Sequence, residues 1–250
     1  MRLNRCGLIL ASILSTSCAL LPDSGGISNS EKAQLNLEMG SRYLELGMLD
    51  IAKTKLDTAL NLDASNPEIQ NSLGVFYERI NDLTQAGEYY QKAAKSAPDN
   101  ASIQSNYGHF LCQRGNHAEG ISLLQKALSS ALNKQPWVAA TNLGICYQQQ
   151  NDLNSAEQYF RQALQSQADY PPALLEMQKI SYHHRQYLSA RGFMERYLSV
   201  AKHTAESLWL ATQTERALGN NKLAADYSQQ LLTSFPSSQQ AQQIKSAISN

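Results

Sequence analysis

Small residues return at a spacing of 34 residues along most of this chain, and this spacing limits its fold more than any other feature. Ala52, Ala86, Gly120, Ala156, Ala190 and Ala224 are separated by 34, 34, 36, 34 and 34 residues. Four glycines precede the first four of these positions by 12 residues each: Gly40, Gly74, Gly108 and Gly144. A unit of this length buries its apolar face only by stacking on its neighbours, so the sequence predicts an elongated array.

The clearest unit, residues 67–100, has the pattern of two antiparallel helices. Its signature residues are Leu73, Gly74, Tyr77, Ala86, Tyr90, Ala93 and Pro98. Gly74 and Ala86 are small enough to let the two helices cross closely, and Pro98 ends the second helix. The pattern resembles the tetratricopeptide repeat, with Leu-Gly-x-x-Tyr, then Ala-x-x-x-Phe, then Pro.

The sequence therefore predicts an all-α, right-handed superhelical solenoid of six helix-turn-helix repeats. We expect the repeats at residues 33–66, 67–100, 101–136, 137–170, 171–204 and 205–238. Two extra residues fall near positions 133–136, where we expect a wider turn. Gln178 and Thr212 replace the signature glycine in the last two repeats. Residues 239–250 are expected to form a capping helix that shields the final core surface.

The first 17 residues have the layout of a secretory signal. Arg2 and Arg5 precede an apolar run at residues 7–14, much shorter than the roughly 20 residues of a membrane-spanning helix. Residues 14–18 (LSTSC) resemble a bacterial lipobox, which predicts acylation of Cys18; an ordinary cysteine beside a cleavage site is the alternative. Residues 18–32 are expected to be a lipidated N-terminus and a flexible linker. Ala19 favours delivery to the outer membrane.

Composition and motifs exclude several classes of function. The chain has 21 Lys and Arg residues and 21 Asp and Glu residues, so its formal net charge is zero and it is not expected to bind nucleic acid. It has no G-x-S-x-G, H-E-x-x-H, C-x-x-C or phosphate-loop motif. We therefore expect no enzymatic activity, no cofactor, no metal site and no small-molecule substrate.

Cys112 and Cys146 fall on the first helices of adjacent repeats, at positions 12 and 10 of their units. An offset of two residues is about 200° around a helix, so the two side chains point toward each other between parallel neighbours. Helices packed about 9 Å apart leave such Cα atoms near disulfide distance. Export would supply an oxidising compartment. A disulfide is the favoured prediction, and two small buried thiols are the alternative.

The first helices are expected to line a concave face that receives an extended peptide or a partner helix. The candidate groove residues mix apolar and uncharged polar side chains: Leu37, Tyr43, Asn71, Val75, Tyr77, Asn106, His109 and Ile145. Because the set has no row of Lys or Arg, it favours a mostly apolar segment of another protein. Alternatively, Val75 and Ile145 only contact neighbouring repeats.

Several stretches resemble the type IV pilus biogenesis and stability lipoproteins, the pilotin family called PilW or PilF. They are residues 39–60, 106–115 (NYGHFLCQRG), 142–146 (NLGIC), 170–176 (YPPALLE) and 208–236. The resemblance implies a lipoprotein anchored to the periplasmic face of the outer membrane through acyl chains on Cys18. It further implies binding to the pilus secretin, promoting its localisation and multimerisation and supporting twitching motility. The alternative is an adaptor that scaffolds cell-wall hydrolases or another envelope complex.

Overall fold

In a computed structural model, residues 27–249 are described and form thirteen α-helices with no strand among them. The first twelve helices pair in chain order: α1 (Asn29–Glu45) and α2 (Leu49–Leu62), α3 (Pro67–Arg79) and α4 (Leu83–Ser96), α5 (Ala101–Gln113) and α6 (His117–Ser129), α7 (Pro136–Gln149) and α8 (Leu153–Ser166), α9 (Pro171–His183) and α10 (Tyr187–Val200), α11 (Ala205–Ala217) and α12 (Asn221–Ser234). The last helix is α13 (Gln239–Ser249). The fold is the all-α solenoid that the repeat predicts, while the secretory signal and Cys18 lie outside the described residues.

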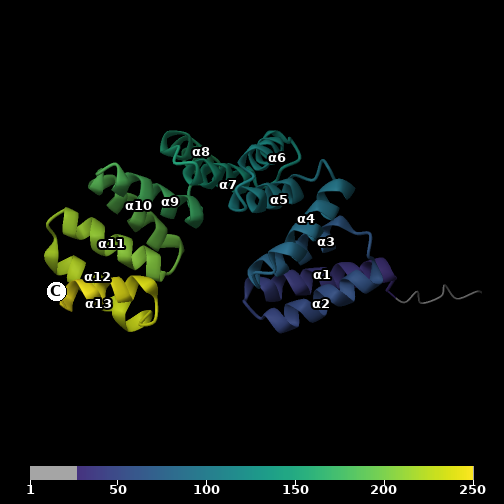
Figure 1. The fold of residues 1–250 in the computed structure, drawn as a ribbon, viewed down its shortest axis with the longest axis horizontal. Helices are drawn as coiled ribbons and strands as arrows, with labels where there is room; N and C mark the ends of the chain where they lie inside the picture. The colour runs from purple at the N-terminus through teal and green to yellow at the C-terminus, as the bar shows by residue number, and fades with distance from the viewer. Residues whose placement is uncertain (1–26, 250) are drawn as a thin grey trace, which may run out of the picture.

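The helical pairs stack into an arch (Figure 1). Helices α5, α7 and α9 lie on its inner side, and α6 and α8 lie on its outer side. First helices of neighbouring repeats also contact each other directly. The contacting pairs are α1 and α3, α3 and α5, α5 and α7, and α9 and α11. The concave face is therefore built from first helices, as the repeat pattern indicates.

Each repeat turns between its two helices at one residue with a left-handed backbone. These residues are Gly47, Asn81, Gly115, Asn151, Arg185 and Gly219, with φ between 60° and 81°. Glycine and asparagine adopt this conformation more readily than other residues, which explains five of the six. The turns therefore share one geometry, and they set the two helices of every unit antiparallel.

The signature glycines lie where the two helices of a unit cross. A Cβ atom on Gly74 would lie 2.6 Å from the ring of Tyr90, and one on Gly40 would lie 2.8 Å from Leu56. Gly108 and Gly144 are equally tight, against α6 and against Phe160. The alanines of the second helices are fully or almost fully buried at the same crossings: Ala52, Ala86, Ala156, Ala190 and Ala224. A larger side chain at either position would separate the two helices.

The N-terminal boundary differs from the one predicted. Helix α1 begins at Asn29, so residues 29–32 are helical and do not belong to a linker. The reason is a capping box: the backbone N–H of Glu31 donates to Oγ of Ser28 over 3.2 Å, and the backbone N–H of Ser28 donates to the Glu31 carboxylate over 2.8 Å. These reciprocal bonds start the helix four residues before the first repeat unit expected from the spacing.

The two ends of the solenoid differ in how their last helices are covered. At the C-terminal end, Ala241 and Ile244 of α13 are buried against Leu208 and Leu231, so α13 covers the core surface of the sixth repeat. At the N-terminal end, no helix precedes α1 among the described residues, and the side chain of Arg42 is exposed. Among the helices of residues 27–249, none combines the length and the apolar character that crossing a membrane requires.

Candidate partner-binding groove

Three adjoining pockets follow the first helices of repeats one to four. The first, of about 530 Å³, lies between α1, α3 and α5 and is lined by Leu37, Glu38, Arg42, Glu68, Asn71 and Ser102, among others. The third, of about 550 Å³, lies between α5, α7 and the α6–α7 loop. It shares Glu68, Asn100 and Ser102 with the first pocket. The two pockets therefore form one continuous depression.

The second pocket, of about 470 Å³, continues this surface along α3 and α5. It contains Val75, Glu78, Asn106 and His109. The hydroxyl of Tyr90 donates to the Glu78 carboxylate over 2.7 Å, and burial together with the charge of Glu78 raises the pKa of Tyr90. The phenol is therefore held as a neutral donor, and Glu78 is fixed at the floor of the pocket.

His109 is held in this pocket as a neutral ring. Its Nε2 atom lies 2.8 Å from the side-chain nitrogen of Gln113, and its Nδ1 atom is buried with no hydrogen-bond partner among the described residues. Burial lowers the pKa of His109 below its ordinary value, although the nearby Glu78 carboxylate acts in the opposite direction. At neutral pH the pocket therefore presents a neutral imidazole.

Polar side chains join the first helices to one another along this surface. The hydroxyl oxygens of Ser41 and Ser72 lie 3.4 Å apart. The Asn106 amide donates to Oδ1 of Asn71 over 3.1 Å, and the Asn142 amide donates to the Ser105 hydroxyl over 3.1 Å. Each amide keeps further donor and acceptor capacity, which suits the N–H and C=O groups of an extended peptide.

Five of the eight predicted groove residues line these pockets. Leu37 and Asn71 line the first pocket, and Val75, Asn106 and His109 line the second. Val75 also packs against the apolar cores of the first and second repeats, so it contributes to both packing and the groove. The structure thus brings these five residues onto one surface of repeats one to three.

Tyr43 and Tyr77 were expected in the groove, but the structure places them elsewhere. Both pack against the core of the first repeat. Tyr77 stacks on Tyr89 of α4 with ring centroids 5.4 Å apart, and Nζ of Lys53 lies 5.7 Å from the Tyr77 ring centroid. The reason is helical geometry. Each tyrosine follows a groove position of its helix by two residues, which is a rotation of about 200° around the helix axis, so its side chain points away from the groove.

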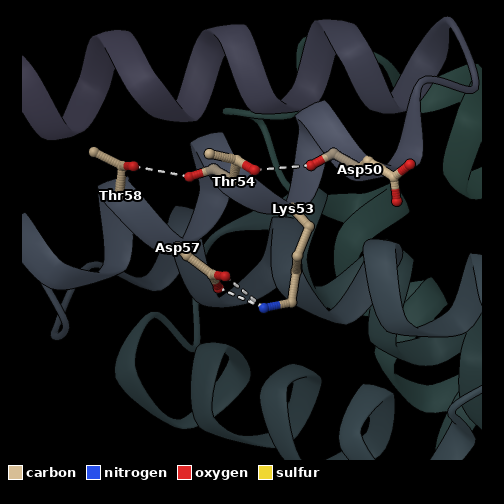
Figure 2. Close-up of polar contacts among 5 residues, drawn as sticks. All are labelled: Asp50, Lys53, Thr54, Asp57 and Thr58. Atoms are coloured by element: carbon tan, nitrogen blue, oxygen red, sulfur yellow. Dashed lines mark hydrogen bonds and ion pairs between the residues drawn. The ribbon is translucent and has the colours of Figure 1, made fainter.

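Figure 2 shows the face of α2 to which Lys53 belongs. Lys53 contacts Asp57 over 2.6 Å, while Thr54 and Thr58 each donate a hydroxyl to a backbone carbonyl one turn earlier. Partial burial alone would lower the pKa of Lys53, but the hydrogen bond and charge of Asp57 outweigh it and raise that pKa. The polar groups of this face are therefore engaged within α2 and with Tyr77.

Ile145 also lies outside the three pockets. It packs against a core cluster that includes Phe160, Met177 and Ile180, between the fourth and fifth repeats. This is the packing role that the sequence left open for it, and it removes Ile145 from the candidate groove.

Charged side chains that are not among the predicted groove residues form much of the lining of the first pocket. Glu38, Glu45 and Glu68 line it with a single guanidinium, Arg42, which pairs with Glu45 over 2.9 Å. Glu68 lies three residues before Asn71 and seven before Val75, so it shares the helix face of these two groove candidates, and their spacing would have found it. Arg42 carries no such signal. The corresponding positions of the next four repeats are apolar and buried: Phe76, Phe110, Cys146 and Ile180. Among the described residues no repeat precedes α1.

Cys112 and Cys146 form a disulfide between α5 and α7, with Sγ atoms 2.02 Å and Cα atoms 5.5 Å apart. Both residues are almost completely buried, in a cluster with Leu124 and Leu143. The bond joins the third and fourth repeats, at the point where the repeat spacing lengthens to 36 residues. It therefore ties together the two first helices that form the third pocket.

Comparison with known proteins agrees with this architecture. Tetratricopeptide-repeat sequence profiles match residues 37–101 and residues 99–169. The chain belongs to the tetratricopeptide-repeat family. It is 26% identical over 242 residues to the type IV pilus assembly protein PilF of Pseudomonas aeruginosa, covering 95% of this chain and 96% of that protein.

Solved structures extend the similarity of this tetratricopeptide-repeat chain. The structure of Pseudomonas aeruginosa PilF superposes with a TM-score of 0.71 at 27% identity, over 88% of this chain and 99% of PilF. PilW, described as a widely conserved type IV pilus biogenesis factor, superposes with a TM-score of 0.72 at 29% identity, over 85% and 97%. The Cut9–Hcn1 complex matches with a TM-score of 0.75 at only 16% identity, which shows the shared fold alone.

Proposed function

We propose that this chain is a type IV pilus biogenesis factor that acts by binding another protein. The observation that carries the proposal is the similarity to PilF, which runs over nearly the full length of both chains. The repeat profiles match residues 37–169 only, whereas the similarity to PilF covers 95% of this chain and 96% of PilF. A binding role without catalysis is part of the proposal.

The partner in this proposal is the pilus secretin, and its binding surface is the series of three pockets on repeats one to four. The pockets combine amide groups, apolar side chains such as Leu37 and Val75, and five carboxylates, those of Glu38, Glu45, Glu68, Glu78 and Asp99. This lining suits an extended segment whose backbone bonds to Asn71 and Asn106. The excess of carboxylates over guanidinium groups in the first pocket favours a basic residue at that end of the segment.

Acylation of Cys18 would anchor the chain to the periplasmic face of the outer membrane. Ser28, the cap of α1, comes ten residues after Cys18, and a fully extended chain of that length spans at most about 35 Å. The anchor would therefore keep the α1 end of the solenoid, and with it the first pocket, close to the membrane surface. A bound secretin subunit would be held where the secretin ring assembles.

The test is secretin multimerisation on an unboiled gel, in cells with and without this gene. The proposal predicts that the high-molecular-weight secretin band is lost in the deletion strain and returns with the wild-type gene. An unchanged band in the deletion strain would contradict the secretin role. Recovery of a cell-wall hydrolase in place of the secretin, by affinity purification of the chain, would then assign it to the adaptor alternative.

A further inference from the structure

The disulfide lies beside a histidine that the groove does not use. In the part of the chain that the structure describes, Cys112, His117 and Cys146 form a group whose ligand atoms all lie within 4.8 Å of one another. The three residues come from α5, from the first turn of α6 and from α7. Nothing in the sequence predicts the group, because His117 shares no helix with either cysteine.

The spacing of these atoms fits a tetrahedral metal site. Zinc binds sulfur at about 2.3 Å and imidazole nitrogen at about 2.1 Å, so tetrahedral angles place the two ligand atoms about 3.6 Å apart. In this structure Sγ of Cys146 lies 3.7 Å from Nδ1 of His117. Two thiolates on one zinc ion need a separation of about 3.8 Å. Rotation about the Cα–Cβ bonds of Cys112 and Cys146 can provide it once the disulfide is opened.

The charges of such a site also fit its surroundings. Two thiolates balance one divalent cation, so the complex has no net charge at a position where both cysteines are almost completely buried. The Sγ atom of Cys112 lies against Gly120 in the first turn of α6. The positive end of a helix dipole favours the thiolate over the thiol. His117 is partly exposed, which gives an ion and a fourth, water ligand a path from solvent.

We propose that the reduced form of this site binds a zinc ion through Cys112, Cys146 and Nδ1 of His117. A dithiol reductant supplies two electrons and two protons to the disulfide and is itself oxidised to a cyclic disulfide. Zinc then displaces the two thiol protons and bonds to both sulfurs. The metal replaces the disulfide as the link between α5 and α7 and adds α6 to that link. The proposal is independent of the partner that the groove binds.

The experiment is a titration of the full chain, reduced with a dithiol that is then removed without oxygen, with Zn²⁺ against a chromophoric indicator. We expect one equivalent to bind the reduced wild-type protein and none to bind the oxidised protein. Co²⁺ in place of Zn²⁺ should give thiolate charge-transfer bands, which report sulfur ligation directly. His117→Ala should lower the affinity of the reduced protein by more than about tenfold, whereas His183→Ala, which changes an exposed histidine of another repeat, should not.

Three results would contradict the proposal. One is a reduced wild-type protein that binds Zn²⁺ no more tightly than the Cys112→Ser/Cys146→Ser double variant. The other is a reduced protein that loses its helical circular dichroism and does not regain it when Zn²⁺ is added. Equal affinities of the wild-type protein and the His117→Ala variant would remove the histidine from the site and contradict the three-ligand assignment.

Discussion

A Cβ atom on Gly120 would lie 2.5 Å from Sγ of Cys112 and 2.7 Å from the carbonyl oxygen of Gly108. The five other repeats have alanine at this position. Cys112 is directed from α5 toward α7, and its sulfur occupies the space that the alanine methyl group fills elsewhere. Glycine at position 120 therefore leaves room both for the Cys112 sulfur and for the close approach of the Gly108 carbonyl.

Gly120→Ala should accordingly destabilise the oxidised protein, although alanine is the usual residue of the repeat and a better helix former. We expect a loss of about 1–3 kcal/mol, because α5 or the sulfur must move to admit the methyl group. The matched control is Gly192→Ala in α10, where a Cβ atom meets nothing within 4 Å. That change should raise the free energy of unfolding by up to about 1 kcal/mol. If urea unfolding showed that both changes raise the free energy of unfolding by the same amount, this packing would be contradicted.

Arg191→Ala should destabilise the fifth and sixth repeats strongly. Glu215 is completely buried, and its carboxylate accepts hydrogen bonds from the Arg191 guanidinium and, over 2.9 Å, from the Asn220 amide. Removing the arginine leaves a buried charge without its counter-ion, which costs about 3 kcal/mol. Urea unfolding of the variant measures this loss.

The control for that variant is Arg161→Ala, which breaks a more exposed pair with Glu157 four residues earlier on α8. Pairs of this kind contribute less than about 1 kcal/mol. Similar losses of unfolding free energy for the two variants would contradict the role of Arg191 as the counter-ion of the buried Glu215 carboxylate.

The neutral His109 should make stability depend on pH in mildly acidic solution. Its pKa is lowered in the folded protein by burial, so below the ordinary value of 6.5 the unfolded chain binds more protons than the folded one. The free energy of unfolding should therefore fall as the pH decreases from 6.5 to the lowered pKa, and be unaffected above 6.5. His109→Gln should flatten that part of the profile. The same slope in wild type and variant would contradict a neutral, buried imidazole.

Cys18→Ala should change where the protein is found in the cell. Without an acylated cysteine the exported chain has no lipid to hold it at a membrane, so it should appear in the soluble periplasmic fraction or remain at the inner membrane. Cell fractionation with detection of the chain measures this. Unchanged outer-membrane fractionation would contradict the lipid anchor.

Much of the fold could be predicted from the sequence because repeat spacing reports directly on stacking. The positions of Gly74 and Ala86 identify a helix crossing, and the two-residue offset between Cys112 and Cys146 indicates which sides of α5 and α7 meet. These inferences depend on local geometry that every unit shares. A side-chain pair between two degenerate repeats does not depend on that shared geometry. The repeat spacing therefore could not predict the Arg191–Glu215 pair.

The groove was predicted less completely than the fold. Asn71, Asn106 and His109 could be predicted because they lie on the groove side of their helices. Tyr77 is a signature residue of the repeat, and it packs on the opposite side of its helix. The position of a residue within its repeat also does not predict which side chains line a pocket at the end of the array. Arg42 and Glu38 line the first pocket on α1, which is the first helix of the described residues. The Ser28–Glu31 capping box was readable in the sequence, but the repeat count placed the start of the first unit after it.

In the proposed function, the groove of repeats one to four binds the secretin. Ser102 is exposed and lines the first and third pockets, so Ser102→Arg should block the groove without disturbing the core. Gln162→Arg, at an exposed position of the outer helix α8, is the matched control. The direct measurement is binding of purified secretin subunit to the wild-type chain and both variants. We predict that wild type and Gln162→Arg bind equally and that Ser102→Arg binds at least about tenfold more weakly, a loss of 1.4 kcal/mol or more. Equal binding by all three proteins, or no binding by the wild type, would contradict the account.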